Sequence, residues 1–233
     1  MEKAHSGESG RRKRHWWRWI IGGVAAILVL IVAAVVLFIK LQPSPAPLAL
    51  PNGKADPPSG VLDGEWSVGS GSLAGFRVKE TAVGVSNYVV GRTSAVTGTL
   101  TVSDDQVNSA TFHINLTDVT VNGKAEPQFQ RSLGTAEHPN AVFTLTKSMA
   151  LGPGFVSGGT ATVSATGDLS MNGVSRLVTF TVTSRRSGNE VEVSGSVPIQ
   201  FSEWAIQGPA GAGFLGSLAN NGVAEFLLYL QHS

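Results

Sequence analysis

From residue 64 to the end of the chain, apolar and polar residues alternate with a period of two. In one such run Phe112 and Ile114 flank the polar His113. Successive side chains of a strand point to opposite faces, so this pattern predicts strands with one buried face. Similar runs cover residues 66–68, 76–78, 100–102, 110–116, 141–145, 161–169, 178–182, 191–199 and 224–230. The alternation therefore predicts an all-β domain.

Short turns separate these runs. Asn172-Gly173 is typical of a type I′ hairpin turn, and Ser187-Gly188-Asn189 joins the next two runs. Strands joined this way indicate an antiparallel arrangement, and about eight of them suggest either a closed barrel or a sandwich. Two stretches break the pattern. Residues 125–136 predict a short helix across a barrel end, and residues 202–222 predict a long Gly-rich loop.

A second constraint lies near the N-terminus, where Ile20 to Ile39 forms a run of twenty apolar or Gly residues. A helix of that length is about 30 Å long, which matches the hydrocarbon core of a bilayer. The run predicts one N-terminal transmembrane helix that acts as an uncleaved signal-anchor. A cleaved signal peptide is the alternative, although its apolar region is normally shorter.

Four segments follow from these features: a basic cytoplasmic tail (1–19), a transmembrane helix (20–40), a Pro-rich linker (41–63) and a β-barrel domain (64–233). The linker holds six of the eleven prolines and is expected to act as an extended spacer. Residues 1–40 carry seven Lys/Arg and two Asp/Glu. Basic flanks stay on the cytoplasmic side, so we expect a single-pass protein of the cell membrane with an extracytoplasmic C-terminal domain.

Composition excludes several functional classes. The chain contains no Cys, so thiolate metal sites and thiol nucleophiles are absent. Residues 41–233 carry ten Lys/Arg and fourteen Asp/Glu, which argues against a nucleic-acid partner. His113 and His138 lack further ligands at metal spacing, and Ser72 and Ser132 lack a triad pattern. We therefore expect no metal, no cofactor other than a possible bound lipid, no catalytic residue and no enzyme activity.

The residues resemble a known family. The hairpin Gly167–Phe180 is similar to the signature turn of the YceI-like, polyisoprenoid-binding domain. Arg131–Leu133 and His138–Phe143 resemble its helix and following strand, and Trp66, Ser72 and Phe76 resemble its opening strand pair. The likeness covers about residues 62–231. It implies a lipocalin-like barrel of the cell envelope that holds a long isoprenoid chain.

The resemblance and the alternation together indicate a candidate ligand wall. Its expected residues are Phe76, Phe112, Ile114, Phe143, Leu169, Val178, Phe180, Trp204, Phe214 and Phe226. For any single wall position ordinary core packing is the favoured interpretation, and Trp204 and Phe214 could instead belong to a loop that plugs the barrel end. A polar headgroup is expected near the Trp204 loop or near Arg131.

Two functions are compared, and the resemblance together with the predicted anchor implies the first of them. The first is a membrane-anchored extracytoplasmic binding protein for isoprenoid lipids, such as polyprenyl or quinone-type chains. The alternative is a structural or protein-interaction module of the cell envelope with a filled barrel core. A continuous internal cavity would distinguish the first from the second.

Overall fold

The computed structural model describes residues 13–41, 44–82, 84–152, 154–208 and 216–233, with side chains described for 21–37, 44–81, 84–152, 154–208 and 217–233. The chain divides into two compact units, Met1–Pro43 and Ser44–Ser233. In the first unit, helix α1 extends over Lys13–Leu41, and residues 1–12 of the predicted tail lie outside the described residues. Within the described part of the chain, no helix meets the combined length and hydropathy of a membrane span.

The second unit is built from strands. They are β1 (Gly64–Val68), β2 (Leu73–Ala82), β3 (Val85–Thr93), β4 (Val96–Ser103), β5 (Gln106–Asn115), β6 (Thr120–Val121), β7 (Lys124–Ala125), β8 (Asn140–Leu145), β9 (Met149–Ala150), β10 (Ala161–Met171), β11 (Val174–Ser187), β12 (Glu190–Gln200) and β13 (Gly216–His232). Helix α2 (Pro127–Ser132) precedes β8, and the 3₁₀ helix η1 (Phe201–Trp204) follows β12.

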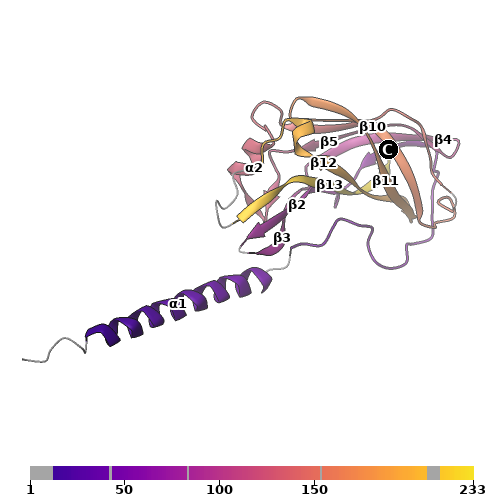
Figure 1. The fold of residues 1–233 in the computed structure, drawn as a ribbon. Coiled ribbons are helices and arrows are strands. Elements are labelled where there is room, and N and C mark those ends of the chain that lie inside the picture. The colour runs from indigo at the N-terminus through magenta and orange to yellow at the C-terminus, as the bar shows by residue number, and fades with distance from the viewer. Residues whose placement is uncertain (1–12, 42–43, 83, 153, 209–215) are drawn as a thin grey trace, which may run out of the picture. The chain divides into compact units, whose positions relative to one another are not determined.

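The sheet closes on itself as an antiparallel barrel. Strand β1 pairs with both β4 and β13, which completes a ring of eight strands in the order β1, β4, β5, β8, β10, β11, β12, β13. Strands β2, β3, β6 and β7 continue from β13 along one side (Figure 1). Closure leaves the ring without an open edge. The predicted all-β barrel with a short helix is confirmed.

Local signals account for the turns and the helix. Asn172 and Gly173 have φ values of 49° and 74°, the left-handed values that a type I′ turn requires. Helix α2 lies within the predicted 125–136 segment and has Pro127 in its first turn. Strand β3 is not among the predicted runs, because the adjacent Val89 and Val90 interrupt its alternation. Strand β13 begins at Gly216, inside the predicted 202–222 loop.

One end of the barrel is closed by large apolar side chains. Trp66, Phe155 and Leu230 are each 1% exposed, and Leu151 packs with them. The indole Nε1 of Trp66 donates to the carbonyl oxygen of Leu62 at 2.9 Å, which satisfies its one polar atom. We call this closed end the floor.

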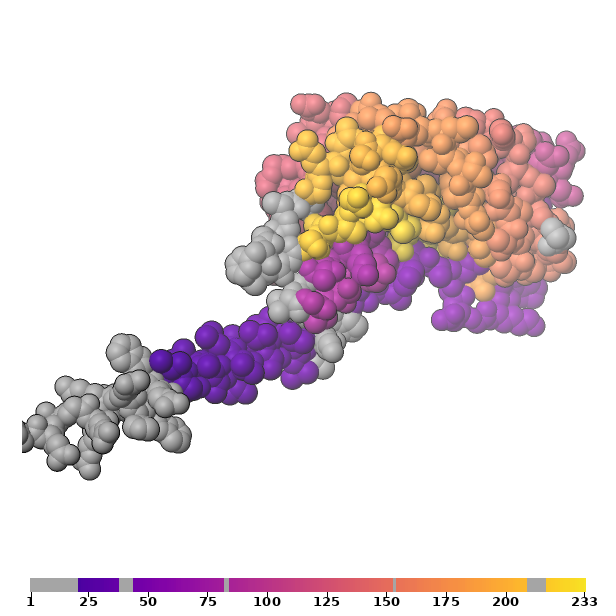
Figure 2. Space-filling model, in the orientation of Figure 1, coloured from indigo at the N-terminus to yellow at the C-terminus, as the bar shows by residue number. Residues whose placement is uncertain are grey.

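Residues 44–60 lie along the outside of the barrel (Figures 1 and 2). The sequence predicts this segment as part of a spacer, but it belongs to the same compact unit as the strands. At one end the backbone N–H of Tyr88 donates to Ser44 Oγ at 3.0 Å. At the other end the N–H of Ser59 donates to the carbonyl oxygen of Gly188 at 2.8 Å. We call residues 44–60 the strap.

Arginines of the barrel wall hold the strap. Arg77 donates to the carbonyl oxygen of residue 45 at 2.6 Å, and Arg92 donates to that of residue 46 at 2.9 Å. Arg185 donates to the carbonyls of residues 51 and 53, both at 2.9 Å. A proline-rich segment cannot form a regular ladder, but its carbonyls remain acceptors. The guanidinium donors satisfy them, and this explains why the segment does not act as a free spacer.

Buried carboxylates complete these contacts. Glu225 accepts from Arg92, lies 3.7 Å from Arg77 Nε, and accepts the N–H of Leu48 at 3.1 Å. Glu192 accepts from Arg185 Nε at 2.6 Å. Both carboxylates are buried, and each has an arginine partner, as burial of charge requires. The strap is therefore fixed by two buried ionic groups along the barrel wall.

Candidate functional site

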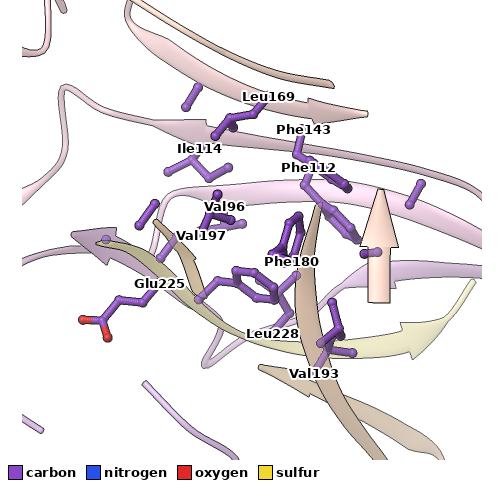
Figure 3. Close-up of a pocket in the computed structure, with 18 of the residues that line it drawn as sticks. Val96, Phe112, Ile114, Phe143, Leu169, Phe180, Val193, Val197, Glu225 and Leu228 are labelled. Atoms are coloured by element: carbon purple, nitrogen blue, oxygen red, sulfur yellow. The ribbon is translucent and has the colours of Figure 1, made fainter. Parts of the chain in front are cut away.

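The barrel encloses an apolar cavity of about 240 Å³ (Figure 3). Its wall comes from inward-facing positions of most strands of the ring, and almost all of the lining side chains are apolar. Voids between packed side chains in a protein core are seldom larger than one water molecule. A water molecule needs about 10–15 Å³ of cavity volume measured in this way. The cavity is therefore far larger than a packing defect, and the barrel core is not filled.

The end of the cavity opposite the floor is lined from helix α2, the residue after it and the segment after β12. Four half-buried apolar side chains line it there: Phe129, Leu133, Phe201 and Ile206. The floor side chains Trp66 and Phe155 also line the cavity but are almost fully buried. We call the half-buried end the mouth, with the four residues as its rim.

Most of the predicted wall residues line this cavity. Those that do are Phe76, Phe112, Ile114, Phe143, Leu169, Phe180 and Phe226. Val178 packs against the core cluster near the mouth and is not part of the cavity wall. Phe214 lies outside the described residues. The period-two pattern thus identifies which side chains face inward. Whether an inward-facing side chain reaches the cavity depends on the three-dimensional packing.

Trp204 has a structural position beside the cavity. Its side chain is 2% exposed and packs in the core cluster near the mouth, and it is not among the cavity-lining residues. The guanidinium carbon of Arg176 lies 5.9 Å from its ring centroid, and Arg176 Nε donates to the Glu203 carbonyl at 2.5 Å. Asn172 Nδ2 donates to the carbonyls of Trp204 and Ala205 at 3.0 and 3.1 Å. These contacts fit the alternative in which the loop folds over the barrel end and Trp204 is its plug.

Aromatic rings form a connected group in the wall. Phe180 makes edge-to-face contacts with Phe143 and Phe226, with centroid distances of 5.3 and 6.0 Å. At the rim, Phe129 of α2 lies 5.6 Å from Phe76 of β2. Edge-to-face pairs contribute about 0.5–1.5 kcal/mol beyond area burial, so the rings hold each other in place.

Glycines opposite the phenylalanines allow these rings to lie against the wall. A Cβ on Gly91 would lie 2.3 Å from the ring of Phe76, and a Cβ on Gly195 would lie 2.6 Å from the ring of Phe226. Two further pairs have the same relation: Gly98 with Phe112 and Gly167 with Phe143. Without a Cβ beneath it, each ring packs onto the backbone of the next strand. The lumen keeps its width because the rings do not project across it.

Gly195→Ala is expected to push the Phe226 ring toward the lumen. Overpacking of this kind costs about 1–3 kcal/mol of unfolding free energy. We expect that loss in urea unfolding, together with weaker uptake of geranylgeraniol followed by tryptophan fluorescence. Adding Phe226→Leu to the same chain should restore both, because the shorter side chain vacates the space that the new methyl group needs. Failure of the second substitution to restore either would contradict the pairing.

Few polar groups reach the cavity. Its lining includes the serines Ser132 and Ser184 and the residue Glu225. The carboxylate of Glu225 points away from the other lining side chains (Figure 3), toward its arginine partners in the wall. Among the residues that the structure describes, no group of three or more His, Asp or Glu could hold a metal ion. The arrangement is suited to an apolar molecule held by burial.

Sequence reasoning missed both ends of the cavity. Leu62, Trp66 and Phe155 form its floor side, and Phe129 and Ile206 lie at its rim. Phe129 lies in the short helix and Ile206 in an irregular loop, where no period-two pattern marks an inward face. Their position at the cavity depends on how the short helix and the loop fold over the barrel end, which the local sequence does not determine.

Comparisons with known proteins agree with this geometry. The model of the YceI-like domain matches residues 66–224, which is more than half of the chain. The chain belongs to the YceI-like family. The matched range of this YceI-like protein begins in β1 and ends within β13, so it covers most of the ring and most of the residues that line the cavity. A comparison with curated proteins finds no match.

A solved structure shows the same fold. A polyisoprenoid binding domain from Saccharophagus degradans, implicated in plant cell wall breakdown, is 16% identical, with a TM-score of 0.55. The match covers 74% of this YceI-like chain and 100% of that domain. BcnA of Burkholderia cenocepacia is 17% identical, with a TM-score of 0.48 and coverage of 66% and 95%. At these identities the likeness concerns the fold alone.

Proposed function

We propose that this YceI-like domain binds the apolar chain of an isoprenoid lipid inside its barrel. The observation that carries the proposal is the apolar cavity, which large buried side chains close at the floor. Burial of apolar surface contributes about 25 cal/mol per Å², so each 100 Å² of chain removed from water contributes about 2.5 kcal/mol. A slender chain is thus held without any charged or catalytic group.

The family supports the choice of ligand class. YceI-like domains include the polyisoprenoid binding domain of Saccharophagus degradans, whose fold this chain shares. A methyl-branched prenyl chain is narrow enough to enter an eight-stranded barrel lengthwise. The cavity disfavours the alternative of a protein-interaction module with a filled core, because such a module needs no continuous internal space.

We further propose that residues 20–40 anchor the protein in the cell membrane and that the barrel lies on the extracytoplasmic side. The support is the run of apolar residues Ile20–Ile39 and the basic residues that precede it. The described side chains of this run within α1 are largely exposed, among them Ile21, Leu30 and Leu37. The anchor would hold a lipid-binding barrel at the surface from which its ligand comes.

Mass spectrometry of organic extracts tests the ligand. The full chain is purified in detergent from a lipid-containing host, alongside Ala165→Phe, which fills the lumen from a fully buried wall position. We expect close to one prenyl lipid per native chain and little with the variant. Bulk phospholipid should be equal in the two samples and acts as the internal control. A native chain that carries no prenyl lipid and takes up no added geranylgeraniol would contradict the proposal.

A further inference from the structure

The strap runs the length of the barrel wall, from the mouth end to the floor end. Its first residue, Ser44, is held by Tyr88 near the start of β3. Its last residues are held at the β11–β12 turn, where Arg186 donates to the carbonyls of Ser59 and Gly60 at 2.7 and 3.1 Å. The chain then enters the floor through Leu62 and Trp66.

Strand pairing places Ser44 at the mouth. Ala82, at the tip of the β2–β3 hairpin, pairs with Gly216, the first residue of β13. Gln200 pairs with Asn221 farther along β13 and leads directly into η1, which contributes Phe201 to the rim. The hairpin, the start of β13 and η1 therefore lie at one end of the barrel, the end that also carries α2 (Figure 1).

We propose that the strap turns the mouth toward the bilayer, so that the apolar rim docks on the membrane surface that holds the anchor. The inference rests on the proposed anchoring of residues 20–40. With the strap docked, only Leu41, Gln42 and Pro43 connect the anchor to Ser44. Three residues span at most about 10 Å, so Ser44, at the mouth end of the barrel, stays within about that reach of the end of the anchor.

An undocked segment would not impose this orientation. Residues 41–63 as a free extended linker would reach about 75 Å at 3.3 Å per residue, and the barrel could tumble. Docking removes almost all of this freedom and leaves the floor as the end distant from the membrane. The chain thus uses a segment that resembles a spacer to fix which end of the barrel meets lipid.

The rim has a composition that suits a bilayer surface. Phe129, Leu133, Phe201 and Ile206 are half-buried apolar side chains at this end of the barrel. Charges of both signs surround them, with Arg131 on α2 and Glu203 on η1. The apolar side chains, and not a net charge, are therefore the groups expected to enter the interfacial zone. A prenyl chain that leaves the cavity here would pass directly into lipid.

Two variants, each with one cysteine that carries a fluorescent label, test the orientation. The chain contains no native Cys, so each label has a single position. Gln128→Cys lies on α2 at the mouth, and Gln106→Cys begins β5 at the floor, both on exposed side chains. Each full-length protein is reconstituted in vesicles with nitroxide-labelled headgroups. We expect the label at 128 to be quenched severalfold more than the label at 106. Equal quenching, or stronger quenching at 106, would overturn the inference.

A tether variant tests the role of the strap. Twenty Gly/Ser residues inserted between Pro43 and Ser44 leave the strap contacts intact and lengthen the tether by about 25 Å on average. We expect the difference between the two labels to shrink. A difference of unchanged size would overturn the assignment to the strap.

Flotation of the native chain with the vesicles distinguishes a failure of the proposed anchor from a failure of the proposed orientation. A chain that does not float overturns the anchor and this inference with it. A chain that floats with equally quenched labels overturns only the orientation and leaves lipid binding in the cavity untouched.

Discussion

Phe180→Glu is expected to abolish retention of an isoprenoid chain. Phe180 lies in the middle of the cavity wall between Phe143 and Phe226. A carboxylate at this position must lose water when an apolar chain enters, and that desolvation costs several kcal/mol. A loss of about 3 kcal/mol corresponds to more than a hundredfold weaker binding. Titration of the purified protein with geranylgeraniol, followed by tryptophan fluorescence, measures the change.

The next residue on the strand supplies a matched control. Thr181 is exposed on the outer face, so Thr181→Glu adds the same charge without reaching the lumen and should bind as the native chain does. Because Phe180→Glu removes core packing as well, circular dichroism must show a folded barrel before its binding is interpreted. If the variant does not fold, Ala165→Phe tests the same wall position from the paired strand without a charge. Native affinity in a folded Phe180→Glu or Ala165→Phe protein would rule out the cavity as the binding site.

Glu225→Ala is expected to lower the free energy of unfolding by about 3–5 kcal/mol, the usual cost of removing one partner from a buried ion pair. The carboxylate is 4% exposed, and without it Arg77 and Arg92 remain in the wall with no counter-charge. The N–H of Leu48 also loses its acceptor. Urea unfolding measures the loss, and Glu65→Ala on the exposed face of β1 is the control expected to stay near the native value.

The same variant should release the strap to proteases. Lys54 is the only Lys or Arg between residues 44 and 63, so trypsin cuts the strap at a single position. We expect cleavage after Lys54 to become about tenfold faster in Glu225→Ala, as the strap opens more often. Glu65→Ala should be cut at the native rate. A strap that is cut equally fast in all three proteins would show that Glu225 does not hold it.

The barrel could be predicted from the sequence because its signals are local. Alternation around Phe112 and Phe180 marks an inward face within a single strand, and Asn172-Gly173 sets a hairpin within two residues. The short helix follows from Pro127 and the loss of alternation around it. Each of these features depends on neighbours in the chain, so no knowledge of distant contacts was needed.

The strap and the rim could not be predicted in this way. The strap is held by hydrogen bonds between residues far apart in the chain, such as Leu48 to Glu225 and Arg185 to Pro51. Proline content alone indicates an extended segment and says nothing about whether arginines elsewhere donate hydrogen bonds to its carbonyls. Trp204 shows the same limit. Its place beside the cavity and not in its wall depends on Asn172 and Arg176, which reach it from another hairpin.

The floor also has a consequence for kinetics. Since Trp66 and Phe155 close one end, a chain held in the barrel must enter and leave through the same opening, sliding along its own length. Each added isoprene unit that still fits inside increases the surface exposed during withdrawal and should lengthen the residence time. Units beyond the depth of the lumen stay outside and add little. The dissociation rate is therefore expected to fall with prenyl length and then level off, and the chain length at which it levels off measures the depth of the barrel.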